Sequence, residues 1–315
     1  MDVQIEHRPA TGSAPPLTLG PLDVPLYVEL GRVPNAATLA AAFEGWQGEP
    51  GAEQPALRLR IERNDRLTGA EGVQFCAREK IIELSGPGVA AWADPMAGLA
   101  FCEVSADYLA APRLLREDVL DPLVLSLLAW HNRTPLHAAG FVAGRVAVLL
   151  AGRSGSGKSC LAKAADDAGY QLLSDDTVYI QLEPHLRVWG WPKATHLLPA
   201  DFQGIGGPER LRNGKLKRVV GLRSASVQAV SAERAVLCVL SQNDALSLSP
   251  LAPQTALQRL FPLDPGFDLL PHQIALAIAA LTARGAWELQ LSRDPAAAIG
   301  LLSANLDRLK ETATP

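Results

Sequence analysis

The sequence predicts an α/β protein in two parts: a small, mostly-β domain over residues 1–112 and a larger domain with a mixed sheet over residues 113–315. Three observations predict it. The chain of 315 residues exceeds a typical single domain and suggests about two. Its first part holds short runs of alternating apolar and polar residues, whereas its second part holds strand-like and helix-like runs around a glycine-rich loop. Hydrophobic content of 48% allows a buried core.

The first domain begins with a segment rich in Pro, Ala, Gly and Ser, residues 1–16, which we expect to be a loose tail. Residues 56–63 alternate apolar and charged side chains, a pattern typical of a half-buried strand. Turn residues separate further strand-like runs. These runs are residues 24–30, 72–77, 80–84 and 100–104. No residue of this domain indicates catalysis.

A helix is expected over residues 114–130, linking the two domains, with Asp121 and Pro122 restarting it as N-cap and first position. Strands are then expected over residues 135–142 and 145–151. Ala143-Gly144 between them predicts a tight hairpin turn. The two strands should therefore run antiparallel, unlike the common phosphate-loop enzymes, whose corresponding strand has parallel neighbours.

The segment Gly152-Arg153-Ser154-Gly155-Ser156-Gly157-Lys158-Ser159 matches the phosphate-binding pattern G-x-x-x-x-G-K-[ST]. An apolar strand precedes it and good helix formers follow, so loop N–H groups and a helix N-terminus can point at one anion. We expect Lys158 to reach the β- and γ-phosphates of ATP or another nucleoside triphosphate, and Ser159 to bind Mg²⁺. The alternative is a chance match. The expected nucleotide-binding residues are Gly152, Ser154, Gly155, Ser156, Gly157, Lys158, Ser159 and Cys160.

Two adjacent acids, Asp175 and Asp176, follow soon after the loop. Gly169 should end the loop helix, and strands are expected over residues 170–174 and 177–182, so the acids lie where a strand ends. Magnesium-dependent phosphoryl transfer needs a carboxylate on the metal, and a kinase often uses another toward the attacking hydroxyl. The alternative is a structural Asp-Asp turn between hairpin strands.

Two further segments leave alternatives open. Trp189 and Trp191 either belong to the core or wall a nucleotide pocket. Residues 210–218 are strongly basic, which fits a solvated hairpin or a loop that offers a cation to transferring phosphate or an acidic substrate. The remaining elements are expected in chain order. They are a buried strand at 235–240, helices at 254–261 and 271–284, a strand at 287–291 and a final helix at 295–310.

Composition excludes several classes of protein. A net charge of −4 argues against a general binder of nucleic acid or anionic membranes. No apolar run approaches the roughly 20 residues of a membrane span, and the first residues lack the order of a signal peptide. The four cysteines show no paired spacing, which favours buried free thiols in a cytoplasmic protein. Cys160, at a helix start, is either reactive or simply a small residue that fits.

Residues 137–180 resemble the catalytic domain of the HPr serine kinase/phosphorylase family. His137 precedes the loop's first glycine by fifteen positions, and Asp175 follows Lys158 by seventeen, as in the family pattern. The stretch Ala168-Gly169-Tyr170-Gln171-Leu172-Leu173-Ser174-Asp175-Asp176 is similar to the family's ending after the loop helix.

The resemblance implies a fold like that of phosphoenolpyruvate carboxykinases, with a mixed sheet around the phosphate loop. It also implies an ATP- and Mg²⁺-dependent kinase acting on a serine of a small protein or peptide. Asp175 matches the general base, Asp176 and Ser159 match Mg²⁺ ligands, Lys158 matches the group that stabilises transferring phosphate, and His137 matches a histidine that orients or tunes the base. Family members form rings, so a homo-oligomer is a possible partner state.

The sequence departs from the family downstream. Arg187-Val188-Trp189-Gly190-Trp191-Pro192 lacks the acid of the family's Glu-containing signature, which argues against a second metal contact and a phosphorylase reaction. The chain is more similar to divergent HPr-kinase-related proteins, some of which resemble kinases that phosphorylate a precursor-peptide serine. Two alternatives remain: a nucleotide-binding regulatory module with little or no kinase activity, and a small-molecule kinase.

Overall fold

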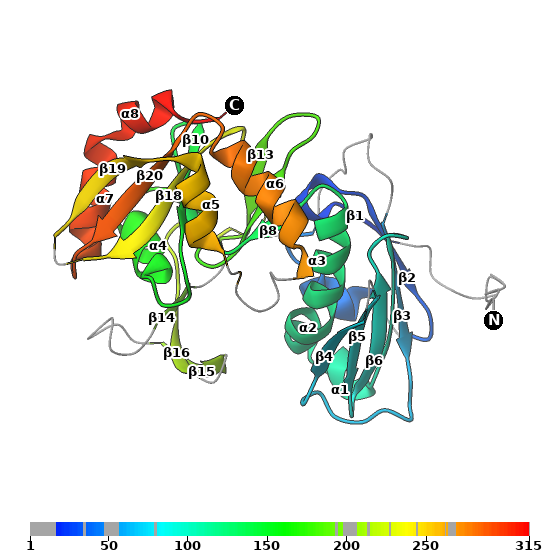
Figure 1. Ribbon diagram of the computed structural model, residues 1–315. Coiled ribbons are helices and arrows are strands. Elements are labelled where there is room, and N and C mark those ends of the chain that lie inside the picture. Colours follow the sequence, from blue (N-terminus) through cyan, green and yellow to red (C-terminus); the bar gives the residue numbers. More distant parts are fainter. Residues whose placement is uncertain are drawn as a thin grey trace. The chain divides into compact units, whose positions relative to one another are not determined.

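The computed structural model describes residues 17–33, 36–46, 57–78, 81–192, 195–197, 207–212, 215–226, 228–243, 245–261, 263 and 269–314. Its chain forms two compact mixed α/β units, Met1–His131 and Asn132–Pro315 (Figure 1). This division falls after the expected boundary at 112/113, because the helical segment that ends at Trp130 packs on the first unit's sheet. The expected loose tail, residues 1–16, lies outside the described residues.

The first unit is built on a seven-stranded sheet. All five strands expected here are present, and β1 and β6 are additional. β6 escaped prediction because its sequence, Val-Ala-Ala-Trp-Ala-Asp, is rich in alanine, which favours helices. In sheet order the strands are β1 (Leu17–Leu19), β2 (Leu26–Leu30), β3 (Leu57–Arg63), β7 (Leu99–Val104), β6 (Val89–Asp94), β5 (Ile81–Gly86) and β4 (Gln74–Arg78).

One face of this sheet is buried beneath helices. Side chains of β2 and β3 alternate, with Leu26, Val28 and Leu30 buried and Tyr27 and Glu29 exposed. Helix α3 packs on β6 and β7. The unit also has two 3₁₀ helices, Pro21–Asp23 and Ala36–Ala42. From residue 106 to residue 130 the chain is almost continuously helical. This stretch consists of α1 (Ala106–Ala110), α2 (Pro112–Leu115), a π-helical turn (Arg116–Leu120) and α3 (Asp121–Trp130).

The expected helix restart at Asp121 is wrong. Leu120 and Asp121 both keep right-handed helical backbone angles, so the helix continues through them. Asp121 instead forms an ion pair with Arg116, whose Nη1 also donates to the backbone oxygens of Ala42 and Glu44 at 2.8 and 2.9 Å. The guanidinium lies 3.9 Å from the ring centroid of Trp46. Asp121 is therefore the charged partner of the buried Arg116 guanidinium, and this role replaces that of an N-cap.

The second unit is built on a six-stranded sheet with β10 near its middle. Gly144, at φ +70°, makes the tight turn between β9 and β10, which pair antiparallel as expected. On its other side β10 pairs parallel with β18, so the sheet is mixed. In sheet order the strands are β11 (Gln171–Ser174), β9 (Ala138–Ala143), β10 (Val146–Ala151), β18 (Arg234–Gln242), β20 (Ala286–Leu291) and β19 (Ser247–Leu251).

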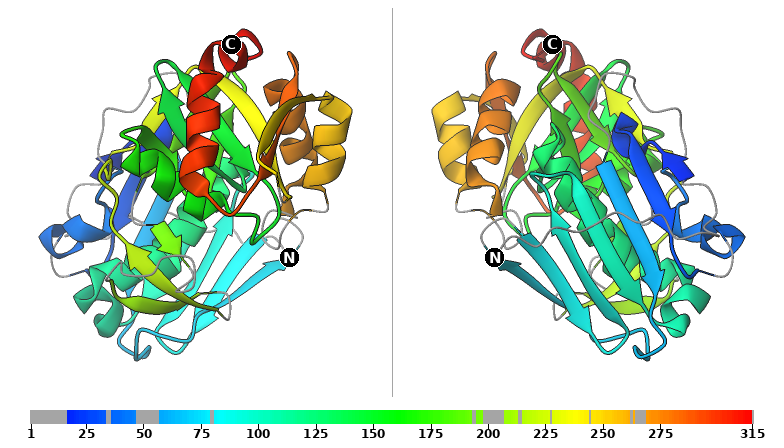
Figure 2. Two further views of the ribbon diagram at one scale, coloured as in Figure 1. Left: turned by 90° about the vertical axis from the view of Figure 1, so that its left-hand side faces the viewer. Right: turned by 90° about the vertical axis from the view of Figure 1, so that its right-hand side faces the viewer.

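Helices cover both faces of this sheet (Figure 2). On one face α4 (Lys158–Asp167) and α7 (Pro295–Ala304) pack together over a core with Phe141, Val148 and Trp287. On the other, α5 (Pro253–Leu260) and α6 (Pro271–Leu281) pack on β18. The expected final helix at 295–310 breaks at Asn305 into α7 and α8 (Leu306–Glu311).

Two smaller antiparallel sheets complete the unit. The four-stranded sheet has the order β17 (Val230–Ala232), β13 (Arg187–Gly190), β12 (Val178–Gln181) and β8 (Thr134–Leu136). The three-stranded sheet has the order β14 (Thr195–Leu197), β16 (Lys215–Val220) and β15 (Glu209–Arg212). The basic segment 210–218 thus forms a hairpin, the simpler of its two interpretations.

The chain crosses twice between the six-stranded and the four-stranded sheet. β8 continues into β9 through His137, and β11 continues into β12 through Asp175, Asp176 and Thr177. β9 pairs with β11 and β8 pairs with β12, so the crossings lie side by side. Gly190 permits this close approach, because a Cβ there would lie 2.3 Å from the backbone oxygen of Leu173.

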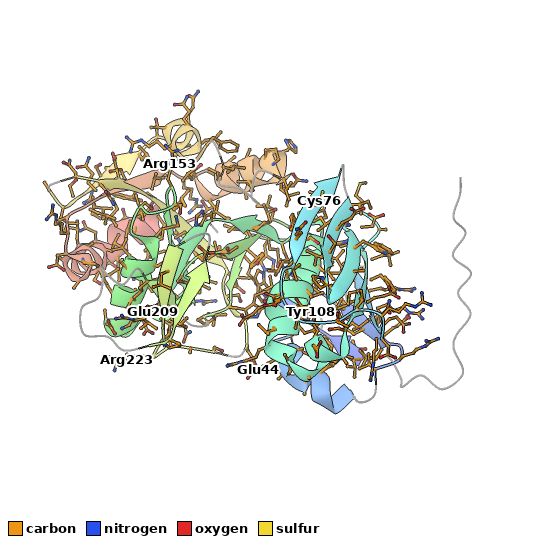
Figure 3. All side chains as sticks on the ribbon, turned by 90° about the horizontal axis from the view of Figure 1, so that it is seen from below. Glu44, Cys76, Tyr108, Arg153, Glu209 and Arg223 are labelled. Carbon is orange, nitrogen blue, oxygen red and sulfur yellow. The ribbon has the colours of Figure 1, made fainter. Side chains whose placement is uncertain are left out.

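None of the described helices is long and apolar enough to cross a bilayer. All four cysteines are free. Cys102 and Cys238 are buried as expected, and burial raises the pKa of Cys238 to about 12. Cys76 on edge strand β4 is exposed, contrary to the expectation of buried thiols (Figure 3).

A buried carboxylate fixes the end of helix α4. Gly169 takes φ +88° after the helix, and the amide of Tyr170 donates to the oxygen of Ala165, which closes the helix as expected. Asp166 accepts hydrogen bonds of 2.8 Å from the backbone N–H groups of Arg223 and Ser224. Burial alone would raise the pKa of Asp166, but these bonds and that of the Ser224 side chain lower it.

We predict that Asp166→Asn destabilises the second unit by about 2 kcal/mol at neutral pH, because two amides lose a charged acceptor. The thermal midpoint should fall by roughly 5 °C. Since the folded pKa is lowered, the wild-type advantage is present above the usual carboxyl pKa and disappears as the pH falls through the lowered value. Thermal scans at pH 7 and in acid measure this difference.

Asp167→Asn is the matched control. The side chain of this neighbouring carboxylate is 51% exposed and forms an ion pair with Lys163 on the helix surface. We expect a loss below about 0.5 kcal/mol. Equal losses for the two variants, or no convergence of Asp166→Asn with the wild type in acid, would contradict the anchoring role.

Candidate functional site

The glycine-rich loop joins the end of β10 to the start of α4. Gly155 and Gly157 have φ values of +85° and +99°, which side-chain-bearing residues rarely adopt. The amide of Ser156 donates to the oxygen of Arg153 at 3.0 Å and closes a turn; Arg153 is labelled in Figure 3. A Cβ at Gly152 would lie 2.8 Å from the Ser156 hydroxyl oxygen. Glycine therefore lets the backbone wrap tightly ahead of the helix.

Lys158 begins α4 and is buried. Its Nζ donates to the backbone oxygens of Gly152 and Arg153 at 2.6 and 3.1 Å. The ammonium group thus lies across the loop, where it neutralises carbonyl dipoles and is placed to meet an anion held by the loop amides.

A cavity of about 960 Å³ opens over the loop and the first turn of α4. It is large enough for a nucleotide-sized ligand. Its polar contributors come from six separate parts of the second unit. The lining residues are His137, Ser154, Gly155, Ser156, Gly157, Lys158, Ser159, Cys160, Leu161, Asp176, Leu197, Lys217, Gln242, Asn243, Leu291, Ser292, Arg293 and Pro295.

The two sheet crossings place a histidine and a carboxylate at this cavity. His137 Nε2 lies 3.4 Å from Asp176 Oδ1. The other acid, Asp175, accepts a hydrogen bond of 2.8 Å from the hydroxyl of Thr195, a fully buried residue of β14. The adjacent carboxylates therefore have different partners and different surroundings.

The residues at the cavity fit a polyphosphate and Mg²⁺. The hydroxyl oxygen of Ser156, within the loop, is buried without a hydrogen-bond partner among the described residues. The Ser159 hydroxyl and the Asp176 carboxylate supply the hard oxygen ligands that Mg²⁺ prefers, in the small number that leaves room for phosphate oxygens and water. No group of three His, Cys, Asp or Glu side chains within the described ranges is arranged as a metal site by itself.

Most of the site residues expected from the sequence lie together here. Every residue from Ser154 to Cys160 lines the cavity, as do His137 and Asp176. Gly152 shapes the loop without lining the cavity, and Asp175 is set back against Thr195. Trp189 and Trp191 do not line it; Trp189 is buried and donates to Gln181, and Trp191 packs edge-on against Tyr179.

Several cavity residues were not predicted. Leu197 comes from a three-residue strand that carries no motif. The same strand supplies Thr195, which bonds to Asp175 without lining the cavity. Gln242 ends β18 and Asn243 follows it. Lys217 belongs to the basic segment 210–218, and the concentration of charge in that segment was the only sequence feature that pointed to Lys217. Arg293 follows β20, beyond any recognisable pattern.

Comparison with known proteins gave distant likenesses among solved structures. No family model matches the chain, and no curated protein matches it. Among solved structures, the chain is similar to the Hpr(Ser) kinase/phosphatase from Coxiella burnetii, with 21% identity over 57% of this chain and 99% of that chain. The TM-score is 0.28, so the likeness is distant and assigns no chemistry to this site.

We predict that Thr195→Val lowers turnover of the site about tenfold while nucleotide affinity stays unchanged, because Asp175 loses the bond that orients it. Thr195→Ser keeps the hydroxyl and is the rescue variant. Steady-state kinetics with a nucleotide titration separate the two effects. Equal turnover in the valine and serine variants would remove the orienting role.

Proposed function

We propose that the chain is an ATP- and Mg²⁺-dependent kinase that transfers the γ-phosphate to a hydroxyl, that of a serine in a small protein or peptide. One observation carries the proposal: Lys158 and Ser159 of the phosphate loop line the same cavity as His137 and Asp176. Phosphoryl transfer consists mainly of positioning and charge stabilisation, and it needs such a combination of cation, hydroxyl and carboxylate.

In this proposal the loop amides and Lys158 bind the β- and γ-phosphates. Ser159 and Asp176 would hold Mg²⁺, which supplies positive charge to the phosphate oxygens when it is bound. His137, whose Nε2 lies 3.4 Å from Asp176 Oδ1, would help to keep that carboxylate directed at the cavity. Lys158 already lies across the loop and would exchange its bonds to the oxygens of Gly152 and Arg153 for phosphate oxygens.

Asp175 is the proposed general base. The acceptor oxygen attacks the γ-phosphorus, the bond from that phosphorus to the β-phosphate oxygen breaks, and the hydroxyl proton passes to Asp175. ADP leaves with the electron pair. The hydrogen bond from Thr195 holds one oxygen of Asp175, which favours a fixed direction for the other.

The proposal extends to fold and surroundings. We propose a phosphoenolpyruvate-carboxykinase-like catalytic domain, supported by the antiparallel approach of β9 to β10. We also propose a cytoplasmic protein that acts on a protein or peptide acceptor, does not bind nucleic acid or membranes, and forms homo-oligomers. The mostly-β domain before it has no proposed chemistry.

A regulatory nucleotide-binding module is the second candidate, and Arg187 favours it. Arg187 stands where the resembling family has an acid, and its Nη2 bridges Glu233 Oε1 at 3.1 Å rather than facing the cavity. Without that acid, ATP would bind but turn over slowly. A small-molecule kinase would share the site and differ only in its acceptor, so mass spectrometry of candidate acceptors after incubation with ATP separates all three.

We predict that Lys158→Ala weakens ATP binding at least tenfold and abolishes phosphotransfer, because the phosphates lose their only buried cation among the lining residues described. Lys163→Ala is the matched control: it lies in the same helix but pairs with Asp167 and does not line the cavity. Calorimetric titration with ATP and Mg²⁺ measures both variants. If the Lys158→Ala variant labelled a substrate with phosphate from ATP as the wild type does, the assignment of a kinase would be wrong.

We predict that Asp175→Asn keeps ATP binding but lowers phosphotransfer by about 10²–10⁴-fold, since an amide cannot accept the hydroxyl proton. Asp176→Asn should instead weaken the Mg²⁺-dependent part of ATP binding. Transfer rates and ATP affinity, measured across Mg²⁺ concentrations, distinguish the roles. The reverse pattern would exchange the two assignments.

A further inference from the structure

One edge of the six-stranded sheet carries most of the residues that line the cavity. β10, β18 and β20 run parallel, so their carboxyl ends lie at the same edge, and β9, antiparallel to β10, begins there. β11 is antiparallel to β9 and therefore ends there as well. Ligands of open α/β sheets bind outside the carboxyl ends of such strands. The order of the strands in the sheet thus gives the order of the cavity residues along this edge.

That order places the phosphate loop, which follows β10, between two groups of residues. Asp176 follows β11 and His137 precedes β9, on one side of the loop. Gln242 ends β18 and Arg293 follows β20, on the other side. All four residues line the cavity. From β11 to β20 there are four strand spacings, about 19 Å, so an extended ligand has room to lie along the edge.

The loop contacts the β18 and β20 side directly. Gln242 Nε2 donates to the backbone oxygen of Gly155 at 3.4 Å. A Cβ at Gly157 would lie 3.3 Å from Leu291 Cδ1. The amide of Asn243 donates to the backbone oxygen of Leu291 at 3.1 Å, which joins the two strand ends. These ends therefore form a wall beside the loop, with the mixture of amide and apolar side chains that suits a nucleoside.

Two cations besides Lys158 line the cavity within the described part of the chain, and they come from opposite sides of the loop. Arg293 is exposed and follows β20. Lys217 is half-buried and belongs to β16, whose neighbour β14 donates to Asp175 through the Thr195 hydroxyl. Lys217 is therefore on the side of the paired acids, and Arg293 is on the side of β18 and β20.

The charges of the lining residues favour an anion that spans both sides. Among the lining residues described, Lys158, Lys217 and Arg293 are positive and Asp176 alone is negative, although the whole chain has a net charge of −4. A polyphosphate carries enough negative charge to meet all three cations. It does so only if it extends from the loop in both directions along the edge.

We infer that the nucleotide lies along this edge, with its γ-phosphate beside Asp176 and Lys217 and its α-phosphate at Arg293. The nucleoside then lies over the ends of β18 and β20. The inference rests on the proposed kinase function and adds two binding residues and a direction. The proposed base, Asp175, follows β11, so the transferred phosphate must lie on that side of the loop. With Lys158 at the middle of the phosphate chain, the rest of the nucleotide extends toward Arg293.

The test compares two nucleotides that differ by the γ-phosphate. The imido analogue of ATP, which resists transfer, and ADP are each titrated into the protein with Mg²⁺ in a calorimeter. We expect Arg293→Gln to weaken both ligands by the same factor, about 3- to 10-fold, because both carry the α-phosphate. Lys217→Gln should weaken the ATP analogue by a similar factor and leave the affinity for ADP unchanged.

Arg284→Gln is the matched control, because Arg284 is an exposed arginine of the same unit that does not line the cavity. We expect this variant to bind both nucleotides like the wild type. Arg293→Lys and Lys217→Arg keep the positive charge, so each should recover part of the lost affinity. A purely structural role of either side chain would not separate the two nucleotides in this way.

Two results would overturn the inference. In one, Arg293→Gln binds both nucleotides like Arg284→Gln; in the other, it weakens the ATP analogue but not ADP, which places the γ-phosphate at β20. With the first result, phosphotransfer that still depends on Asp175 leaves the kinase proposal standing. Failure of the wild type to bind the ATP analogue would remove the kinase proposal itself, so the two failures are distinguishable.

Discussion

The double crossing of the chain between two sheets is the constraint on which the candidate site depends. β8 passes into β9, and β11 into β12, at adjacent points, so His137 and Asp175-Asp176 lie between strands of the two sheets. Such joints carry polar side chains at low cost. Gly190 keeps the four-stranded sheet close enough for both crossings, and the hairpin β9–β10 then delivers the phosphate loop beside them.

The mixed sheet follows from the same arrangement. Because β9 arrives from a crossing and turns back at Gly144, the strand that leads into the loop has an antiparallel neighbour on one side and parallel β18 on the other. The helix after the loop is fixed at its far end by Asp166 and at its core face by α7. Loop, helix and crossings are thus held by separate contacts, which gives the cavity rigid walls.

Much of this could be predicted, since the strongest signals are local. The loop, the hairpin at Gly144 and the cap at Gly169 follow from short patterns that need particular backbone angles. What escaped prediction depends on distant partners. Asp121 has the sequence pattern of an N-cap but forms an ion pair with buried Arg116. The alanine-rich segment β6 is a strand because it pairs with its neighbours in the sheet. Thr195 donates to Asp175 only because the folded chain brings the two together.

The anchoring of Asp166 has a thermodynamic consequence. Its carboxylate ties the helix that starts at the phosphate loop to Arg223 and Ser224, which lie shortly after the end of β16 at Val220. A nucleotide bound at the phosphate loop and an acceptor bound beside it would both act on this helix. Linkage then requires reciprocity: if nucleotide favours the acceptor, the acceptor favours nucleotide by the same factor.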